Sequence, residues 1–277
     1  MTSSSEFWDA LAPYHSSIED DYFDPPSLRL ILHHIHPPVL VVGAGQGLIV
    51  EELRKNGFQT DGVDFSPEMI RHAKTRRGLE IKQADAKDMP FQDGAYQTII
   101  YTTGVVDFMP DDEDIRLIMS EARRVVDRSG DIFVAFYRFS RTTEGFLRKL
   151  GLLKDNALSV KESLRIHQLN PVQAIVWVAH KAEIGLFPAA IISLRSWFLS
   201  PMGEKQRAFN MRKIFGKMDS PSSLINAAPE IQPYRNELQI RNLFDRLAIP
   251  IKTFEASASC YVVQIKMEGT SGTAPSR

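Results

Sequence analysis

The sequence predicts an α/β protein with a doubly wound, mostly parallel sheet. In the first half of the chain, short apolar runs alternate with segments of helical periodicity, which is typical of parallel strands joined by helices. A glycine-rich loop, Gly43–Gly47, follows the first apolar run, and the acidic residues Asp64 and Asp85 follow the next two. Because the carboxyl ends of parallel strands meet at one edge of a sheet, we expect these three features to share a surface.

Five strands are expected before residue 138. The run Val39–Val42 is uninterrupted and apolar, as in a strand buried at the centre of a parallel sheet. Shorter apolar runs predict further strands over residues 60–64, 79–84, 96–101 and 131–137. The spacing between these runs leaves room for a helix after most strands, which predicts parallel pairing.

Two of the intervening helices carry clear end signals. Ser66 is a residue type that caps helix N-termini, Pro67 suits the first helical position, and Gly78 suits the residue after the last turn. A second helix is expected over residues 111–128, because its first turn is acidic and its last turn holds arginines.

Overall charge limits the function classes. The 277 residues carry a net charge of −1, which argues against a nucleic-acid footprint, so we expect no DNA partner and consider RNA only as a weak alternative. The balance is uneven, since residues 1–137 hold 13 Lys and Arg against 23 Asp and Glu, whereas residues 138–235 hold 15 against 7. The acidic first half and the basic middle segment therefore suggest separate functional layers.

Cysteine content and hydropathy bear on location. The single cysteine, Cys260, excludes an internal disulfide framework, and we expect no metal site. The first residues lack the apolar core of a secretory signal, and the apolar stretch Ile184–Leu194 is shorter than the ~20 residues that span a bilayer. We expect a cytoplasmic protein and leave its oligomeric state open.

The three strand-end features suit a nucleoside ligand. Glycines let the backbone of the Gly43–Gly47 loop turn sharply and approach a ligand, although a tight strand-to-helix turn is the alternative. A dinucleotide fingerprint needs its third glycine where Leu48 stands, which disfavours NAD. Asp64 is placed to accept hydrogen bonds from ribose hydroxyls, and Asp85 is either an adenine contact or an ordinary turn residue.

Four segments in this order, VLVVGAGQGLIVEEL, DGVDFSPEMIRHAKTR, IKQADAKDMPFQDGAYQTII and EARRVVDRSGDIFVAFY, resemble successive motifs of class I S-adenosylmethionine-dependent methyltransferases. They are most similar to the small-molecule branch that includes the ubiquinone/menaquinone methyltransferases. The stretch over residues 236–266 resembles the family's closing helix and antiparallel strand hairpin. The resemblance implies a Rossmann-like, seven-stranded sheet and methyl transfer from S-adenosyl-L-methionine to a small-molecule acceptor.

The resemblance also implies roles for individual residues. The glycine loop would hold the methionine part of the cofactor, the second strand end the ribose, the third the adenine, and the end of the fourth strand the amino acid portion. Trp8 and Tyr14 of the N-terminal helix are the candidates for an aromatic lid over the cofactor, with packing of the helix onto the core as the alternative, above all for Trp8. The cofactor-binding residues expected on this basis are Tyr14, Gly43, Ala44, Gly45, Gly47, Asp64, Phe65, Asp85, Ala86, Thr102 and Thr103.

Some positions depart from the family pattern. Gln46 stands where the family usually has Thr, and Gln97 stands where Asp commonly precedes the apolar run of the fourth strand. No Asn-Pro-Pro-Tyr motif follows that strand, which disfavours methylation of DNA bases or of protein glutamine.

The chain divides into four parts on this interpretation. Residues 1–137 form the cofactor-binding core, residues 138–235 a largely helical insertion, residues 236–268 the closing helix and hairpin, and residues 269–277 a flexible tail. The insertion is too long for an ordinary connection, so we expect it to form an acceptor-binding cap. Its aromatic and basic residues suit an apolar or anionic acceptor, or a peripheral membrane or lipid-like contact.

The catalytic chemistry is less defined than the cofactor site. Asp107, Tyr137 and His167 are the candidates for a general base or a substrate contact, although a lone His or Tyr is more often structural. The alternatives to a methyltransferase are a non-catalytic binding module that uses the basic insertion for docking, a tRNA methyltransferase, and an NAD-dependent oxidoreductase.

Overall fold

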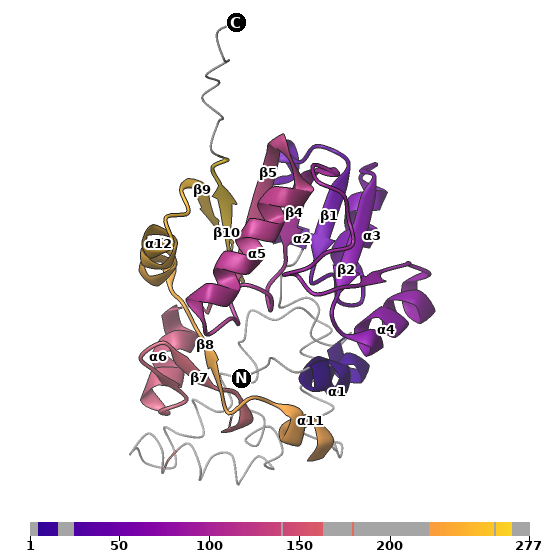
Figure 1. The fold of residues 1–277 in the computed structure, drawn as a ribbon. Coiled ribbons are helices and arrows are strands. Elements are labelled where there is room, and N and C mark those ends of the chain that lie inside the picture. The colour runs from indigo at the N-terminus through magenta and orange to yellow at the C-terminus, as the bar shows by residue number, and fades with distance from the viewer. Residues whose placement is uncertain are drawn as a thin grey trace, which may run out of the picture.

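A seven-stranded sheet forms the centre of the computed structural model (Figure 1). Its strand order is β3-β2-β1-β4-β5-β10-β9; the first five strands pair in parallel, and β10 is antiparallel to both β5 and β9. The predicted fold class is thereby confirmed. The structure describes residues 5–15, 25–139, 141–162, 179, 222–257 and 259–267.

Most elements of the sheet and its helices are short. No helix among the residues described above is long and apolar enough to cross a membrane. The strands are β1 (Val39–Val42), β2 (Thr60–Asp64), β3 (Lys82–Gln83), β4 (Tyr96–Tyr101), β5 (Val126–Tyr137), β9 (Ile251–Ala256) and β10 (Cys260–Ile265). The helices around them are α1 (Ser5–His15), α2 (Pro25–Arg29), the 3₁₀ turn η2 (Leu32–His34), α3 (Leu48–Lys55), α4 (Pro67–Arg77), α5 (Asp112–Val125) and α12 (Glu237–Arg246).

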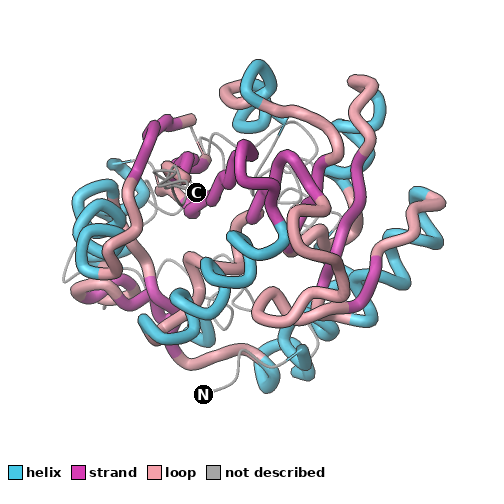
Figure 2. Tube along the Cα trace, turned by 45° about the horizontal axis from the view of Figure 1, so that its top comes forward, coloured by secondary structure: helices cyan, strands magenta, loops and turns pink. Residues whose placement is uncertain are grey.

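The central strand β1 contributes to two apolar cores, one on each face of the sheet. Leu40 and Val42 pack into a cluster with the buried faces of α5 and α12, whereas Val39 and Val41 pack into a second cluster with α2 and α3. Successive side chains of a strand point to opposite faces, so a strand covered on both sides must be apolar throughout. Figure 2 shows these helices lying on either side of the strands.

The predicted helix ends are confirmed for α4. The Ser66 hydroxyl accepts a hydrogen bond from the Met69 amide at 3.1 Å, and Gly78 follows the helix with a φ of 68°. Helix α5 is shorter than expected, because Val126 already pairs with Tyr96 in the ladder between β4 and β5. Strand β5 therefore begins five residues before the predicted position at residue 131.

The third strand is also shorter than predicted. Only Lys82 and Gln83 pair with β2, although the expected strand covered residues 79–84. The chain after β3 is held by helix α5 instead. There, Glu121 accepts a hydrogen bond from the Met89 amide at 2.7 Å, and Arg124 donates to the carbonyl oxygens of Met89 and Phe91 at 3.0 and 2.7 Å. These side-chain bonds fix the chain between β3 and β4 against α5.

The described parts of segment 138–235 include strands that the sequence did not predict. A small antiparallel sheet with the order β6-β7-β8 lies within the segment expected to be largely helical, and its third strand follows a short helix. Residues 163–178 and 180–221 of the expected helical insertion lie outside the described residues. The elements are α6 (Arg141–Lys149), β6 (Leu153–Lys154), β7 (Ala157–Ser159), α11 (Ser222–Ala227) and β8 (Ile231–Pro233).

Gly62 of β2 is a sensitive packing position. A Cβ atom there would lie 2.7 Å from the Ile81 side chain and 3.0 Å from those of Ala44 and Val50. We expect Gly62→Ala to lower the free energy of unfolding by about 1–3 kcal/mol, as overpacked cores do. Gly145→Ala is the matched control, because a Cβ there meets nothing within 4 Å and alanine favours the helix. Urea denaturation of both variants measures the difference, and equal stability would contradict the packing argument.

Candidate functional site

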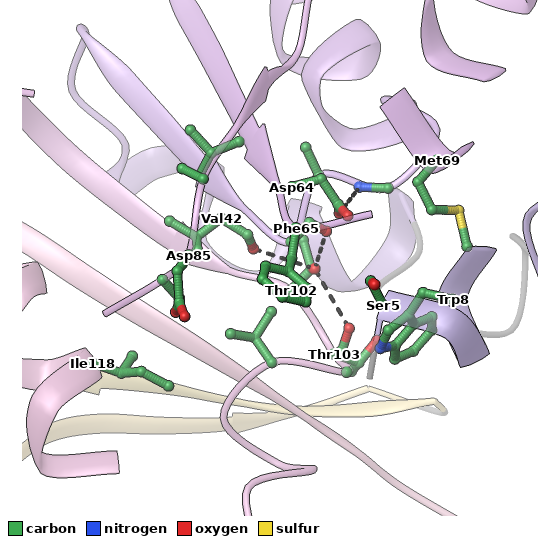
Figure 3. A pocket seen from close by; sticks show the side chains of 18 of the residues that line it. Ser5, Trp8, Val42, Asp64, Phe65, Met69, Asp85, Thr102, Thr103 and Ile118 are labelled. Atoms are coloured by element: carbon green, nitrogen blue, oxygen red, sulfur yellow. Dashed lines mark hydrogen bonds between the residues drawn. The ribbon is translucent and has the colours of Figure 1, made fainter. Parts of the chain in front are cut away.

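A cavity of about 690 Å³ opens at the carboxyl ends of β1, β2 and β4 (Figure 3). Its volume falls in the range of roughly 300–1,000 Å³ that small-molecule sites occupy. The parallel strands of an open α/β sheet place ligands at this edge. Of the residues predicted to bind the cofactor, the cavity lining contains Gly43, Ala44, Gly45, Asp64, Phe65, Asp85, Ala86, Thr102 and Thr103.

The glycine loop takes a backbone conformation that other residues rarely adopt. Gly43, Gly45 and Gly47 have φ values of 71°, 54° and 86°. Gly43 and Gly45 line the cavity, whereas Gly47 is not among its lining residues; a Cβ at Gly47 would lie 2.5 Å from the Leu79 side chain. The first two glycines bring the backbone to the cavity, and the third allows close packing beside the loop.

Asp64 anchors this loop at the end of β2. Its Oδ2 accepts a hydrogen bond from the Gly45 amide at 2.7 Å, and its Oδ1 accepts one from the Ser66 amide at 2.9 Å. Burial raises the pKa of this carboxyl above its ordinary value, and the backbone donors oppose that rise. A carboxylate offers about four acceptor positions, so Asp64 keeps acceptor capacity for a hydroxyl group of a ligand.

Asp85 and Phe65 also line the cavity. Asp85 accepts a hydrogen bond from the Lys87 amide at 2.9 Å, and the Lys87 ammonium group forms an ion pair with Asp114 at 3.1 Å. Phe65 is 46% exposed, so its ring offers an apolar surface to a planar group. Ile118 of α5 borders the same cavity, as Figure 3 shows. An apolar surface beside a carboxylate suits a heterocycle with an amino group.

The end of β4 is bonded directly to the glycine loop. The Thr102 hydroxyl donates a hydrogen bond to the Gly43 carbonyl oxygen at 2.6 Å, and the Thr102 amide donates to the Val42 carbonyl oxygen at 3.0 Å. Thr103 lines the cavity next to it. These hydrogen bonds hold the part of the cavity wall formed by Thr102 and Gly43 in place without a ligand.

Helix α1 covers one side of the cavity through Trp8. The Trp8 ring stacks on Phe108 with a centroid distance of 5.8 Å and an interplanar angle of 15°. Gly104 has a φ of 93°, and a Cβ there would lie 2.9 Å from Trp8 Cη2, so the ring rests against the glycine backbone. Trp8 lines the cavity (Figure 3), whereas the side chain of Tyr14 lies outside the described residues.

The two departures from the family pattern have different surroundings. Gln46 is buried; its Nε2 donates to the Ala12 carbonyl oxygen at 2.6 Å, and its Oε1 accepts from Arg76 at 3.1 Å. It therefore joins the glycine loop to α1 and α4. Gln97 accepts a long hydrogen bond from the Ser129 hydroxyl, at 3.5 Å, and its side chain also interacts with Asp127.

Of the predicted catalytic residues, the two that the structure describes, Asp107 and Tyr137, are not among the residues that line this cavity. Asp107 is buried, and its carboxylate accepts hydrogen bonds from the Gly104 amide at 2.6 Å and the Tyr137 amide at 3.1 Å. Asp107 and Tyr137 border a small neighbouring cavity, and His167 lies outside the described residues. The described geometry favours a positioning role for Asp107, and the three catalytic assignments stay predictions.

Arg235 completes the surroundings of Asp107. Its guanidinium group donates to the carbonyl oxygens of Asp107 and Met109, both at 2.8 Å. Burial raises the pKa of Asp107 to about 7, although its two amide donors and the charge of Arg235 act in the opposite direction. This cluster joins the loop after β4 to the end of β5 and to the chain that follows β8.

Several residues that line the cavity were not predicted from the sequence. Lys87, Asp114 and Ile118 reach the cavity, but their sequence context indicates only a loop and an amphipathic helix. Ser5 and Glu6 precede the predicted lid residue Trp8 in the same helix. The spacing of Asp114 and Ile118 places them on one helix face, but nothing local to the sequence identifies what that face meets.

Comparison with known proteins identifies a domain. Residues 39–130 match a family model described as a methyltransferase domain. An uncharacterized protein of Mycobacterium tuberculosis is 32% identical over 132 residues, which cover 46% of this chain and 45% of that protein. The demethylmenaquinone methyltransferase of Thermus thermophilus is 31% identical over 100 residues, covering 34% of this chain and 44% of the relative. The chain thus spans less than half the length of these two curated relatives.

The fold is shared with solved structures. The crystal structure of a protein from Methanosarcina mazei, described as a SAM-dependent methyltransferase, aligns with a TM-score of 0.51 at 15% sequence identity. The alignment covers 85% of this chain and 95% of that chain. At this identity the match concerns the fold.

The raised pKa of Asp107 predicts a pH-dependent stability. The folded protein holds this proton more tightly than the unfolded chain, whose pKa is about 3.9, so stability is lost as the pH rises through about 7. Relative to Asp107→Asn, we expect the unaltered protein to lose up to about 1.4 kcal/mol of unfolding free energy per pH unit between about 5 and 7. Denaturation of both proteins at several pH values measures this.

Asp127→Asn is the control for that experiment. Hydrogen bonds from Ser129 lower the pKa of Asp127, so its contribution changes only below about pH 4. A stability difference between the unaltered protein and Asp107→Asn that stays constant from pH 5 to 8 would contradict the assignment.

Proposed function

We propose that this chain, a class I S-adenosylmethionine-dependent methyltransferase, methylates a small-molecule acceptor that is apolar or anionic. The observation that carries the proposal is the single cavity in which the glycine loop, Asp64 and Asp85 meet at successive strand ends. Methyltransferase chemistry is supported by the domain match over residues 39–130. The acceptor is inferred from the surroundings of the cavity.

The described residues fit the cofactor. We expect the remaining acceptor capacity of Asp64 to receive the ribose hydroxyls, and Asp85 to accept from the adenine amino group beside Phe65. Gly43 and Gly45 let the backbone approach the amino acid portion, next to Thr102 and Thr103. S-adenosylmethionine supplies a methyl group on a sulfonium that is already a good leaving group.

The protein's contribution to the rate is mainly positioning. Holding two reactants in line removes a large part of the entropic barrier. The loop from Thr102 to Phe108 is fixed by the Thr102 hydroxyl at one end and by Asp107 at the other, so the cavity wall beside it is preorganised. Where the acceptor atom is a hydroxyl, a base must also remove its proton, and Asp107, Tyr137 and His167 remain the proposals for that step.

The acceptor side is apolar in the core and basic in the insertion. Trp8 and Phe108 form an aromatic wall over Gly104, and Val105 and Met109 line the same cavity. Segment 138–235 has 15 Lys and Arg against 7 Asp and Glu. An aromatic wall suits an apolar ring system, and the basic composition of the segment suits an anion. The relative from Thermus thermophilus, named as a demethylmenaquinone methyltransferase, supports the apolar alternative.

Cofactor binding gives the first test. We expect S-adenosylmethionine and S-adenosylhomocysteine to bind, and Asp64→Ala to weaken both by about 1–3 kcal/mol, since its ribose partners lose a buried acceptor. Asp61→Asn is the control, because Asp61 lies on the same strand but accepts from the Tyr96 hydroxyl at 2.8 Å, away from the cavity lining. Isothermal titration measures the affinities. If neither compound binds folded protein, the proposal fails.

Turnover gives the second test. Labelled S-adenosylmethionine is supplied with an apolar quinone, a small aromatic acid, a neutral polar alcohol and tRNA. We expect label in the quinone or the acid, and a rise in KM with salt only for the anionic acceptor. Binding of the cofactor with no transfer to any acceptor would favour a non-catalytic module. Transfer to tRNA with strongly salt-dependent binding would replace the small-molecule assignment.

A further inference from the structure

Helix α1 is joined to the helix after β2 by the carboxylate of Asp9. Asp9 Oδ1 accepts a hydrogen bond from the Ser66 hydroxyl at 2.5 Å and a longer one from the Glu68 amide at 3.3 Å. The Ser66 hydroxyl oxygen in turn accepts from the Met69 amide at 3.1 Å. Because Ser66 is fully buried and its oxygen caps α4, its hydroxyl proton is directed to Asp9.

The same chain of hydrogen bonds continues into the cavity. The Ser66 amide donates to Asp64 Oδ1 at 2.9 Å, and the Gly45 amide donates to Asp64 Oδ2 at 2.7 Å. Asp9 is therefore connected through one serine to the carboxylate that is expected to hold the ribose. A shift of Ser66 moves both an amide donor of Asp64 and the first turn of α4.

Helix α1 meets the cavity at two further points. The Ala12 carbonyl oxygen accepts from Gln46 of the glycine loop at 2.6 Å, and the Trp8 ring rests on Gly104. Leu11 of the same helix shares an apolar cluster with Met69 of α4 and Leu224 of α11. The docked position of α1 is thus defined by the same residues that shape the cavity.

Two carboxylates flank Ser66, and this arrangement has an electrostatic cost. The negative charge of Asp9 contributes to the raised pKa of Asp64. The amino end of α4, with the amides of Glu68 and Met69, carries partial positive charge that offsets the repulsion. In the docked position, the Ser66 hydroxyl and the Glu68 amide take the place of water around the Asp9 carboxylate, which links Asp9 to the docking of α1.

We propose that Asp9 is a positioning residue that, through Ser66, couples the docking of α1 to the binding of the nucleoside by Asp64. The inference rests on the proposed function, because the nucleoside is that of S-adenosylmethionine. Ligand binding stabilises the docked helix, and by thermodynamic reciprocity the docked helix raises the affinity for the ligand.

The test uses the full chain with S-adenosylhomocysteine as the ligand. Asp9→Ala removes the acceptor, whereas Asp9→Asn keeps an oxygen for Ser66 and removes only the charge. We expect Asp9→Ala to raise Kd by about tenfold and Asp9→Asn by less than about threefold. Glu68→Gln is the matched control, since it removes a neighbouring carboxylate that contacts Arg71 at the surface, and its Kd should not change.

A second readout separates positioning from a general loss of structure. Hydrogen exchange of the α1 amides is measured with and without ligand. In the unaltered chain and in Asp9→Asn, we expect the ligand to slow exchange in α1. In Asp9→Ala, we expect this protection to be lost while the loop over residues 43–47 is still protected, which also shows that the variant is folded.

The outcomes distinguish the two proposals. Equal Kd values and equal α1 protection in the unaltered chain and Asp9→Ala overturn the role of Asp9 and leave the proposed function intact. Loss of binding to the same extent in Asp9→Asn and Asp9→Ala overturns the hydrogen-bond route through Ser66. Absence of S-adenosylhomocysteine binding in the unaltered chain overturns the proposed function, and the coupling with it.

Discussion

The hydrogen bonds of Asp64 are the constraint on which the site depends. One carboxylate, at the end of β2, accepts amide hydrogen bonds from Gly45 of the loop after β1 and from Ser66 before α4. The loop after β1 and the turn before α4 are thereby held in a fixed position relative to each other at the edge of the sheet. The loop must contain glycine to approach so closely, and α4 must begin at a residue that can cap it. The cavity shape follows from these local requirements.

The sheet core was predictable because its signals are local. A strand buried on both faces must be apolar at every position, as in Val39–Val42, and a capped helix shows Ser66, Pro67 and Gly78 in order. The small sheet of β6, β7 and β8 was not predictable in this way. Strands of two or three residues have no measurable periodicity, and their pairing depends on chain segments about 75 residues apart, such as Ser159 with Ile231.

The strand-end residues of the cavity could be predicted from the sequence because their signals are also local. A polar residue at the end of a strand has a known place in an open sheet, so Asp64 and Asp85 were located from sequence position alone. The surroundings of Asp107 depend on distant contacts. Its neighbours Tyr137 and Arg235 lie 30 and 128 residues away. Nothing near Asp107 in the sequence indicates that its carboxylate bonds the Gly104 and Tyr137 amides.

Helix α1 connects the glycine loop and the sheet edge to the segment that follows β5. It contacts the glycine loop through Ala12, the loop after β4 through Trp8 and the first turn of α4 through Asp9, and it packs on α11 in the segment that follows β5. The core supplies fixed partners for all three contacts, since Gln46, Gly104 and Ser66 are themselves held by the sheet edge. Any movement of α11 therefore acts on the cavity through a helix whose position the cavity also determines. This reciprocal dependence physically links α11 to the cavity at the carboxyl ends of the parallel strands.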